Sequence, residues 1–180
     1  MKIKIKNHPV IKDIKILNFS KFEDERGFFT RKYCEIQLSR LNFKIKQINY
    51  SKNNKKGTIR GLHFLKYPSK EKKIVTCLSG EVFDVIVDVR RNSKTYKKVI
   101  TIKLSEENSL GVYIPNGFAH GFQTLKNKTN LLYFHSTFYD KNLDSGINPL
   151  DKDLNITWPL KVNSISQKDG NSPFMSSKYF

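Results

Sequence analysis

Two of the four histidines lie in contexts that suit proton transfer. His63 ends an Arg-Gly-Leu-His sequence, and His120 lies in a Gly-Phe-Ala-His-Gly sequence, where glycine lets the backbone approach a ligand closely. Histidine ordinarily changes its charge near neutral pH, so it can take up and return a proton there. A lone histidine is usually structural, which is our interpretation of His8 and His135. We expect His63 and His120 to face a functional site.

A metal site is the main alternative for these two histidines. Many double-stranded β-barrels hold a metal with a His-x-His pair, a nearby carboxylate and a later histidine, whereas this sequence contains no His-x-His pair. His63 and His120 also lack partners at the spacing of metal ligands. We therefore expect no catalytic metal and no other cofactor.

The segments around these residues have the period-two pattern of strands. Residues 74–78 form a β-branched run that ends at Ser79-Gly80, and residues 82–89 alternate along their length. We predict two strands joined by a hairpin turn at Ser79-Gly80. If the second strand lies between two layers, Asp84 points into an enclosed space, where a carboxylate needs partners.

Other short segments share this strand pattern at regular spacing. They cover residues 14–19, 43–50, 97–104, 111–114, 117–125 and 130–138. Only residues 33–41 suggest a helix, and the turn-rich chain beyond Asp140 is expected to pack over the mouth of the site. This spacing predicts an all-β sandwich or barrel. Gln47 and Asn49 share one strand face with apolar residues, which predicts a polar cavity.

Composition limits the class of function. The 180 residues, 38% hydrophobic and 12% aromatic, suffice for one core, so we expect a single domain over residues 1–180. The net charge of +17 comes mainly from lysines spread along the chain, without a basic helix or an arginine-rich block. This favours background composition over a nucleic-acid surface, and it is compatible with a small anionic ligand.

Cysteine usage and hydropathy address the compartment. Cys34 and Cys77 form no CxxC motif, which favours a reducing interior over a disulfide or zinc scaffold. The N-terminus lacks the uninterrupted apolar run of a signal peptide, and no later run approaches the roughly 20 residues needed to span a bilayer. We expect a soluble cytoplasmic protein that does not act in a membrane.

Ten short sequences, taken in order, resemble those of dTDP-4-dehydrorhamnose 3,5-epimerases. They are Asp24-Glu-Arg-Gly-Phe-Phe29, Arg60-Gly-Leu-His63, Lys73-Ile-Val75, Gly80-Glu-Val-Phe-Asp-Val85, Val87-Asp-Val-Arg90, Leu104-Ser-x-x-Asn108, Ile114-Pro-x-Gly-Phe-Ala-His-Gly-Phe122, Leu132-Tyr133, Ile156-x-Trp-Pro159 and Ser166-x-Lys-Asp169. The resemblance covers nearly the whole chain. It implies a cupin-like double-stranded β-helix (jelly roll) with a few short helices, a homodimer without a metal, and action on a nucleotide-linked 4-keto-6-deoxy sugar. The expected role is in deoxysugar biosynthesis, as for a lipopolysaccharide or capsule.

Inverting a carbon beside a ketone needs a base, a group that stabilises the enolate oxygen, and an acid on the opposite face. The resemblance implies that His63 is the base and that Asp169 orients its imidazole. It also implies that Lys73 lies near the enolate oxygen. Tyr133 would be the acid on the opposite face, the alternative being a core tyrosine at a strand end.

The resemblance also implies a set of substrate-binding residues. They are Arg26, Phe28, Gln47, Asn49, Arg60, Asp84, His120, Phe138, Asp144 and Lys168. Arginine and lysine suit a diphosphate, and the ring of Phe138 would stack on the nucleobase. Arg26 and Phe28 would come from the partner subunit of a homodimer.

Several residues depart from the usual pattern of the family. They are Arg31, Tyr50, Leu65, Phe134, Asp144 and Pro149. Because most of them would surround the ligand rather than the base, the acid or Lys73, we expect retained epimerase chemistry with an altered substrate, such as another nucleotide or a modified hexose or heptose. Two alternatives stay open. One is an epimerase that acts at C3 or C5 alone, or a keto-sugar isomerase, on a non-dTDP nucleotide sugar such as a heptose. The other is a non-catalytic jelly roll that binds a sugar nucleotide.

Overall fold

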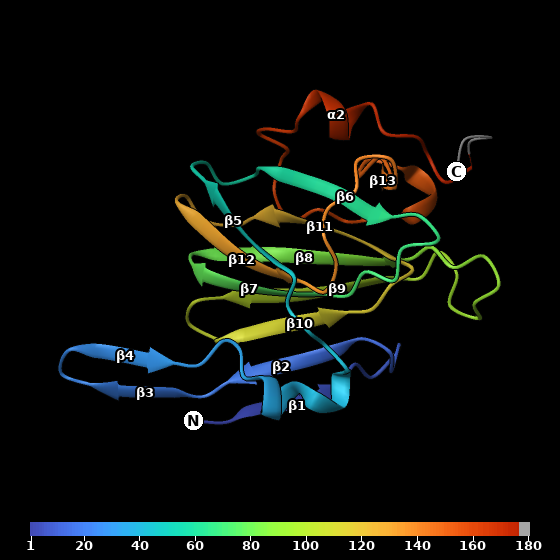
Figure 1. Ribbon diagram of the computed structural model, residues 1–180. Helices are drawn as coiled ribbons and strands as arrows, with labels where there is room; N and C mark the ends of the chain where they lie inside the picture. Colours follow the sequence, from blue (N-terminus) through green and yellow to red (C-terminus); the bar gives the residue numbers. More distant parts are fainter. Residues whose placement is uncertain (177–180) are drawn as a thin grey trace.

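Two β-sheets packed on one another make up most of the structure (Figure 1). The computed structural model describes residues 1–176. The first sheet has the strand order β1–β2–β10–β7–β12–β5, and the second has the order β13–β6–β11–β8–β9. The strands are β1 (Ile3–Asn7), β2 (Lys15–Phe19), β5 (Gln47–Asn53), β6 (Ile59–Leu65), β7 (Lys73–Ser79), β8 (Glu81–Asp88), β9 (Val99–Ser105), β10 (Leu110–Ile114), β11 (Phe118–Thr124), β12 (Thr129–His135) and β13 (Asp144–Gly146).

The chain crosses between the two sheets at almost every connection after β5, and neighbouring strands in each sheet are antiparallel. This alternation is the topology of a double-stranded β-helix, so the expected jelly roll is confirmed. The helices are short: α1 (Glu35–Leu38), α2 (Gln167–Gly170) and the 3-10 turns η1 (Ser39–Leu41) and η2 (Lys152–Leu154). Among residues 1–176, no helix has the length and apolar character needed to cross a membrane.

The predicted hairpin at Ser79-Gly80 is wrong. β7 pairs with β10 and β12, whereas β8 pairs with β11 and β9, so this turn carries the chain from one sheet to the other. Gly80 has a φ of 77°, and a Cβ there would lie 2.3 Å from Oγ1 of Thr129. A turn sequence predicts that the chain reverses direction, but it does not predict which strands the two flanking segments pair with.

The main core lies between the two sheets and contains Val82 and Ile86 of β8. Val85, which points the other way, is covered by the C-terminal segment through residues such as Leu154. Both faces of β8 are therefore covered. Asp84 lies in the alternation of Val82 and Ile86 and is fully buried, which agrees with the expectation from the sequence.

The segment that precedes β5 packs on the outer face of the first sheet. The predicted helix over residues 33–41 is present only as α1 and η1, and it buries Leu38 and Leu41 in a second core. Ile36 is 84% exposed and contributes nothing to that face. The strand predicted at residues 43–50 begins later, at Gln47, because the preceding residues connect η1 to the sheet.

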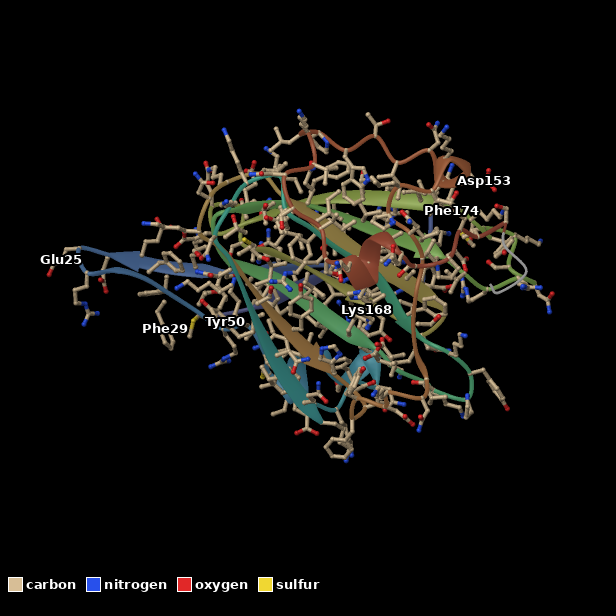
Figure 2. The ribbon with its side chains drawn as sticks, turned by 90° about the horizontal axis from the view of Figure 1, so that it is seen from above. Glu25, Phe29, Tyr50, Asp153, Lys168 and Phe174 are labelled. Carbon is tan, nitrogen blue, oxygen red and sulfur yellow. The ribbon has the colours of Figure 1, made fainter. Side chains whose placement is uncertain are left out.

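A two-stranded hairpin, β3 (Lys21–Asp24) and β4 (Gly27–Thr30), extends away from the body of the molecule. Figure 2 shows Glu25 at its tip and Phe29 on its flank. Phe22 and Phe29 are 69% and 68% exposed, and Phe28 is also exposed. Large aromatic side chains grouped on an exposed hairpin are typical of an interaction surface.

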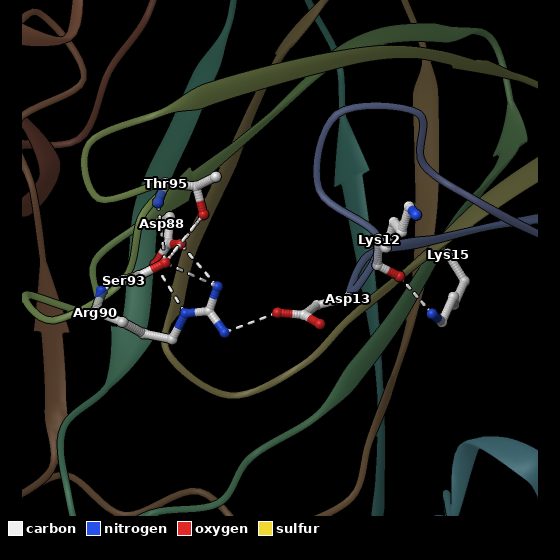
Figure 3. A network of polar contacts seen from close by, with 7 residues as sticks. All are labelled: Lys12, Asp13, Lys15, Asp88, Arg90, Ser93 and Thr95. Carbon is white, nitrogen blue, oxygen red and sulfur yellow. Dashed lines mark hydrogen bonds and ion pairs between the residues drawn. The ribbon is translucent and has the colours of Figure 1, made fainter.

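A network of polar contacts surrounds Asp88, the last residue of β8 (Figure 3). The buried Asp88 accepts hydrogen bonds from Nε of Arg90 at 2.9 Å, from Oγ of Ser93 at 2.7 Å and from Oγ1 of Thr95 at 2.6 Å. Arg90 also contacts Asp13 of the N-terminal segment, at 2.8 Å from Nη1 to Oδ2. Burial alone would raise the pKa of Asp88, but these donors lower it to about 2.

Replacing Asp88 by Asn should lower the free energy of unfolding by about 3 kcal/mol at pH 7, because Arg90 loses its buried partner. The pKa of Asp88 is depressed in the folded state, so this stabilisation is present above about pH 4 and lost as the pH falls through about 2. Urea unfolding of the native protein and the variant, at pH 7 and at about pH 2, measures this stabilisation. Asp13→Asn, which removes a more exposed partner of Arg90, should cost at most about 1 kcal/mol. Equal losses for the two variants would contradict this account.

Candidate active site

A cavity of about 270 Å³ lies between the two sheets. The second sheet contributes Arg60 and His63 from β6 and His120 from β11, and the first sheet contributes Lys73 from β7 and Tyr133 and His135 from β12. The inner faces of two packed sheets face each other, so these groups form two opposed walls of the cavity. A ligand in the cavity would meet different chemistry on its two sides.

His63 is held by a carboxylate from the far end of the chain. Its Nε2 lies 2.7 Å from Oδ1 of Asp169, whose other oxygen accepts the backbone N–H of Gly61 at 3.1 Å. Asp169 lies in α2, where Oγ of Ser166 caps the first turn. Burial would raise the pKa of Asp169, but the contacts with His63 and Gly61 lower it overall. The C-terminal segment thus packs beside the site, as expected, and supplies an ionised partner for His63.

His120 forms a second pair of this kind. Its Nε2 lies 2.7 Å from Oδ2 of Asp84, and both side chains are buried. Burial raises the pKa of Asp84, although the neighbouring His120 opposes this. Asp84 is fully buried behind His120 and is not among the residues that line the cavity. Asp84 is one of the residues expected to bind substrate, and in this structure its carboxylate is the partner of His120.

Tyr133 stands on the wall opposite His63. It comes from β12, and its ring packs against His120 with the centroids 6.2 Å apart. Burial, and then the charge of Asp84, raise the pKa of Tyr133 strongly, while Arg60 acts in the other direction. The phenol is therefore protonated at neutral pH and has a cation nearby.

Glu71 and His135 are cavity residues that sequence reasoning missed. Nδ1 of His135 lies 2.9 Å from Oε1 of Glu71, and Nζ of Lys73 lies 3.2 Å from its Oε2. The interpretation of His135 as merely structural is incomplete, because its ring lines the cavity and stacks beside Tyr133 at 6.2 Å. The alternation of side chains along a strand could have identified His135, since it follows Tyr133 by two residues and so shares its face.

Four of the predicted binding residues line the cavity: Asn49, Arg60, His120 and Asp144. Gln47 lies beside them, where Nε2 donates to Oδ1 of Asn49 at 3.1 Å and Oε1 accepts the backbone N–H of Tyr139 at 3.0 Å. Lys168 forms an ion pair with Asp144, and the hydroxyl of Tyr139 donates to the same carboxylate at 3.1 Å.

Six predicted binding residues do not line the cavity of this chain: Gln47, Asp84 and Lys168, described above, and Arg26, Phe28 and Phe138. Phe138 is 70% exposed, and Phe28 lies on the projecting hairpin. Arg26 lies at the tip of the same hairpin, where it pairs with Asp24 at 2.7 Å. Within one chain, the structure thus assembles the predicted base, acid and cation but not the predicted aromatic clamp.

The residues that depart from the family pattern fall into two groups. Tyr50, Leu65 and Asp144 line the cavity and can alter what it accepts. Phe134 points to the outer face of the first sheet, where it is buried and stacks on Tyr33 at 6.0 Å. The backbone oxygen of Pro149 accepts a hydrogen bond from Trp158 at 2.9 Å. Only the first group bears on the ligand.

A jelly roll whose cavity sets a carboxylate-paired histidine against a half-buried tyrosine defines a cupin-like sugar epimerase, which is an isomerase. Residues 8–177 match the family described as dTDP-4-dehydrorhamnose 3,5-epimerase, and the chain belongs to this family.

Similar proteins of known name agree. The dTDP-4-dehydrorhamnose 3,5-epimerase of Shigella flexneri is 41% identical over 175 residues, covering 94% of this chain and 96% of that protein. The crystal structure of the Bacillus anthracis enzyme with TDP and pyrophosphate is 38% identical, with a TM-score of 0.91 over 96% of this chain and 99% of that one. The Legionella pneumophila enzyme in complex with dTDP-4-keto-L-rhamnose is 35% identical, with a TM-score of 0.89 and coverage of 96% and 92%.

Proposed function

We propose that residues 1–180 act as one domain that epimerises a dTDP-linked 4-keto-6-deoxy sugar at C3 and C5. The observation that carries this proposal is the placement of His63 and Tyr133 on opposite walls of one cavity. Membership of the family supports the reaction, and the sugar nucleotide bound to the Legionella relative supports the class of substrate.

His63 acts as the base. The ionised Asp169 can only accept a hydrogen bond, so Nε2 of His63 carries the proton and Nδ1 keeps a free lone pair. Nδ1 removes the proton from the carbon beside the C4 ketone. The negative charge of Asp169 then stabilises the imidazolium that forms.

Lys73 stabilises the enolate. The C4 oxygen gains negative charge as the proton leaves, and a fixed cation in a cavity shielded from water stabilises that charge more than water would. Lys73 is 7% exposed and lines the cavity, so its ammonium meets these conditions.

Tyr133 returns a proton to the opposite face of the enolate. Its raised pKa keeps the phenol protonated until the carbanion accepts the proton. The phenolate left behind is disfavoured by burial, and the positive charge of Arg60 reduces this cost. Inversion follows because the removal and the return of the proton use different walls.

We propose that the chain functions as a homodimer in which the β3–β4 hairpin reaches the cavity of the partner. The support is that Arg26 is exposed and does not line the cavity of its own chain, while Phe22 and Phe29 on the same hairpin are open to contact. In this arrangement Arg26 meets the diphosphate, and Phe28 with Phe138 holds the base.

Mixing two inactive variants tests this arrangement. Arg26→Ala should weaken substrate binding and His63→Ala should stop the chemistry, yet subunit exchange between them should restore activity. The mixed dimer contains one cavity with a native His63 and a native Arg26 from the other subunit. Steady-state assays before and after exchange measure the recovery, with Arg40→Ala as a control for loss of a surface arginine. A mixture that stays as inactive as its components would show that the hairpin does not serve a partner.

Conversion of dTDP-4-keto-6-deoxyglucose, followed by proton NMR, tests the activity itself. We expect inversion at both C3 and C5. A specific observation favours a second candidate, an epimerase that acts at one carbon or on a bulkier sugar: Tyr50 and Leu65, which depart from the family pattern, line the cavity. Inversion at one carbon alone would support that candidate, and binding without any conversion would support a non-catalytic module.

A further inference from the structure

An additional buried carboxylate organises one wall of the cavity. Glu71 precedes β7, and its two oxygens contact different groups: Oε1 lies 2.9 Å from Nδ1 of His135 and Oε2 lies 3.2 Å from Nζ of Lys73. The side chains of Glu71, His135 and Lys73 are 11%, 13% and 9% exposed. All three line the cavity.

We propose that Glu71 is a positioning residue that, together with His135, sets the place and effective charge of the Lys73 ammonium at the enolate oxygen. This inference rests on the proposed function. It concerns side chains other than the base and the acid, and it gives His135 a task in the reaction.

Glu71 shares one negative charge between two donors, His135 and Lys73. Burial alone would raise the pKa of Glu71, but the hydrogen bond from His135 and the charge of Lys73 lower it to about 2. Glu71 is therefore ionised throughout the working pH range. An anion beside a buried ammonium keeps that ammonium charged, but it also competes with the substrate for the positive charge.

His135 limits this competition. Its Nδ1–H donates to Oε1 of the ionised Glu71, so Lys73 contacts one carboxylate oxygen rather than both. The ring of His135 is fixed in turn, because it stacks on Tyr133 with an interplanar angle of 16° and its Nε2 lies 3.4 Å from Nδ2 of Asn49. Lys73 is thus held by a single oxygen of Glu71 and can turn toward the enolate.

Other charged and titratable groups face this wall and contribute to any pH profile. They are Arg60 and His63 on β6, Asp84 behind His120 on β8 and β11, Tyr133 on β12, and Tyr139 and Asp144 on the following segment. A test must therefore compare variants that change one of these contacts and leave the rest in place.

Glu71→Gln should lower kcat about tenfold with KM nearly unchanged, because the Lys73 ammonium loses the carboxylate that holds it in place. Glu81→Gln is the matched control, since Glu81 pairs with Lys103 at 3.5 Å on a surface outside the cavity. The control should leave kcat and KM unchanged.

His135→Ala should act differently. Glu71 remains and both of its oxygens can contact Lys73, so kcat should fall about tenfold to a hundredfold because Lys73 is drawn out of position. His135→Asn keeps a donor near the place of Nδ1 and should restore most of kcat. KM should change little in either variant if the effect is on the enolate.

These outcomes separate a positioning role from a structural one. If Glu71→Gln and His135→Ala only lower the melting temperature and the active fraction, with an unchanged kcat per active enzyme and no rescue by His135→Asn, the inference is overturned. Failure of the native enzyme to convert any 4-keto sugar nucleotide would refute the proposed function instead, so the two failures are distinguishable.

Discussion

His63→Ala should lose proton exchange and epimerisation together, each by about 10²–10⁴-fold, because no enolate forms without the base. The structure supports this expectation, since the Nδ1 lone pair of His63 is available only because Asp169 holds Nε2 at 2.7 Å. Solvent exchange at C3 and C5 and conversion to product can be followed by NMR in the same sample.

A matched control for this variant is His8→Ala. His8 lies in the N-terminal segment, where its Nδ1 accepts the backbone N–H of Val10 at 3.2 Å, outside the cavity. It should retain both activities. Exchange that continued at the native rate in His63→Ala would mean that another group removes the proton.

Tyr133→Phe should separate the two activities. His63, Asp169 and Lys73 are untouched, so the enolate still forms and is reprotonated from the side of His63, and exchange continues. Inversion should fall by the roughly 10²–10⁴-fold typical of losing a general acid. The ratio of exchange to inversion, measured by NMR in D2O, reports this separation directly.

Tyr113→Phe is the matched control for this second variant, because Tyr113 is a buried tyrosine in the core on the other face of the first sheet. It should preserve the native ratio. If Tyr133→Phe lost exchange and inversion equally, the phenol would be needed to bind the substrate or to form the enolate, and its assignment as the opposite-face acid would be wrong.

Local alternation explains which parts of the fold were predictable from the sequence. The period-two pattern of residues 82–89 placed Asp84 correctly between the layers, because side-chain direction along a strand depends on position alone. The same pattern cannot state which strands pair. The Ser79-Gly80 turn was therefore predicted as a hairpin, although it joins strands of different sheets.

The candidate site was predictable in part, for a similar reason. The pairing of His63 with Asp169 joins residues 106 positions apart, and only the resemblance to a family indicated it. The contact between Glu71 and His135, 64 positions apart, lies outside that resemblance and was missed. Contacts between distant segments depend on the packing of the two sheets, which no local pattern encodes.

The most direct test of the central claim is the fate of solvent deuterium when the native enzyme converts dTDP-4-keto-6-deoxyglucose in D2O. Because His63 removes a proton from one face and Tyr133 delivers a solvent-derived one to the other, the account predicts product with inverted configuration and one deuterium at both C3 and C5. Inverted product that retains its original hydrogen at these carbons would contradict the proposed mechanism.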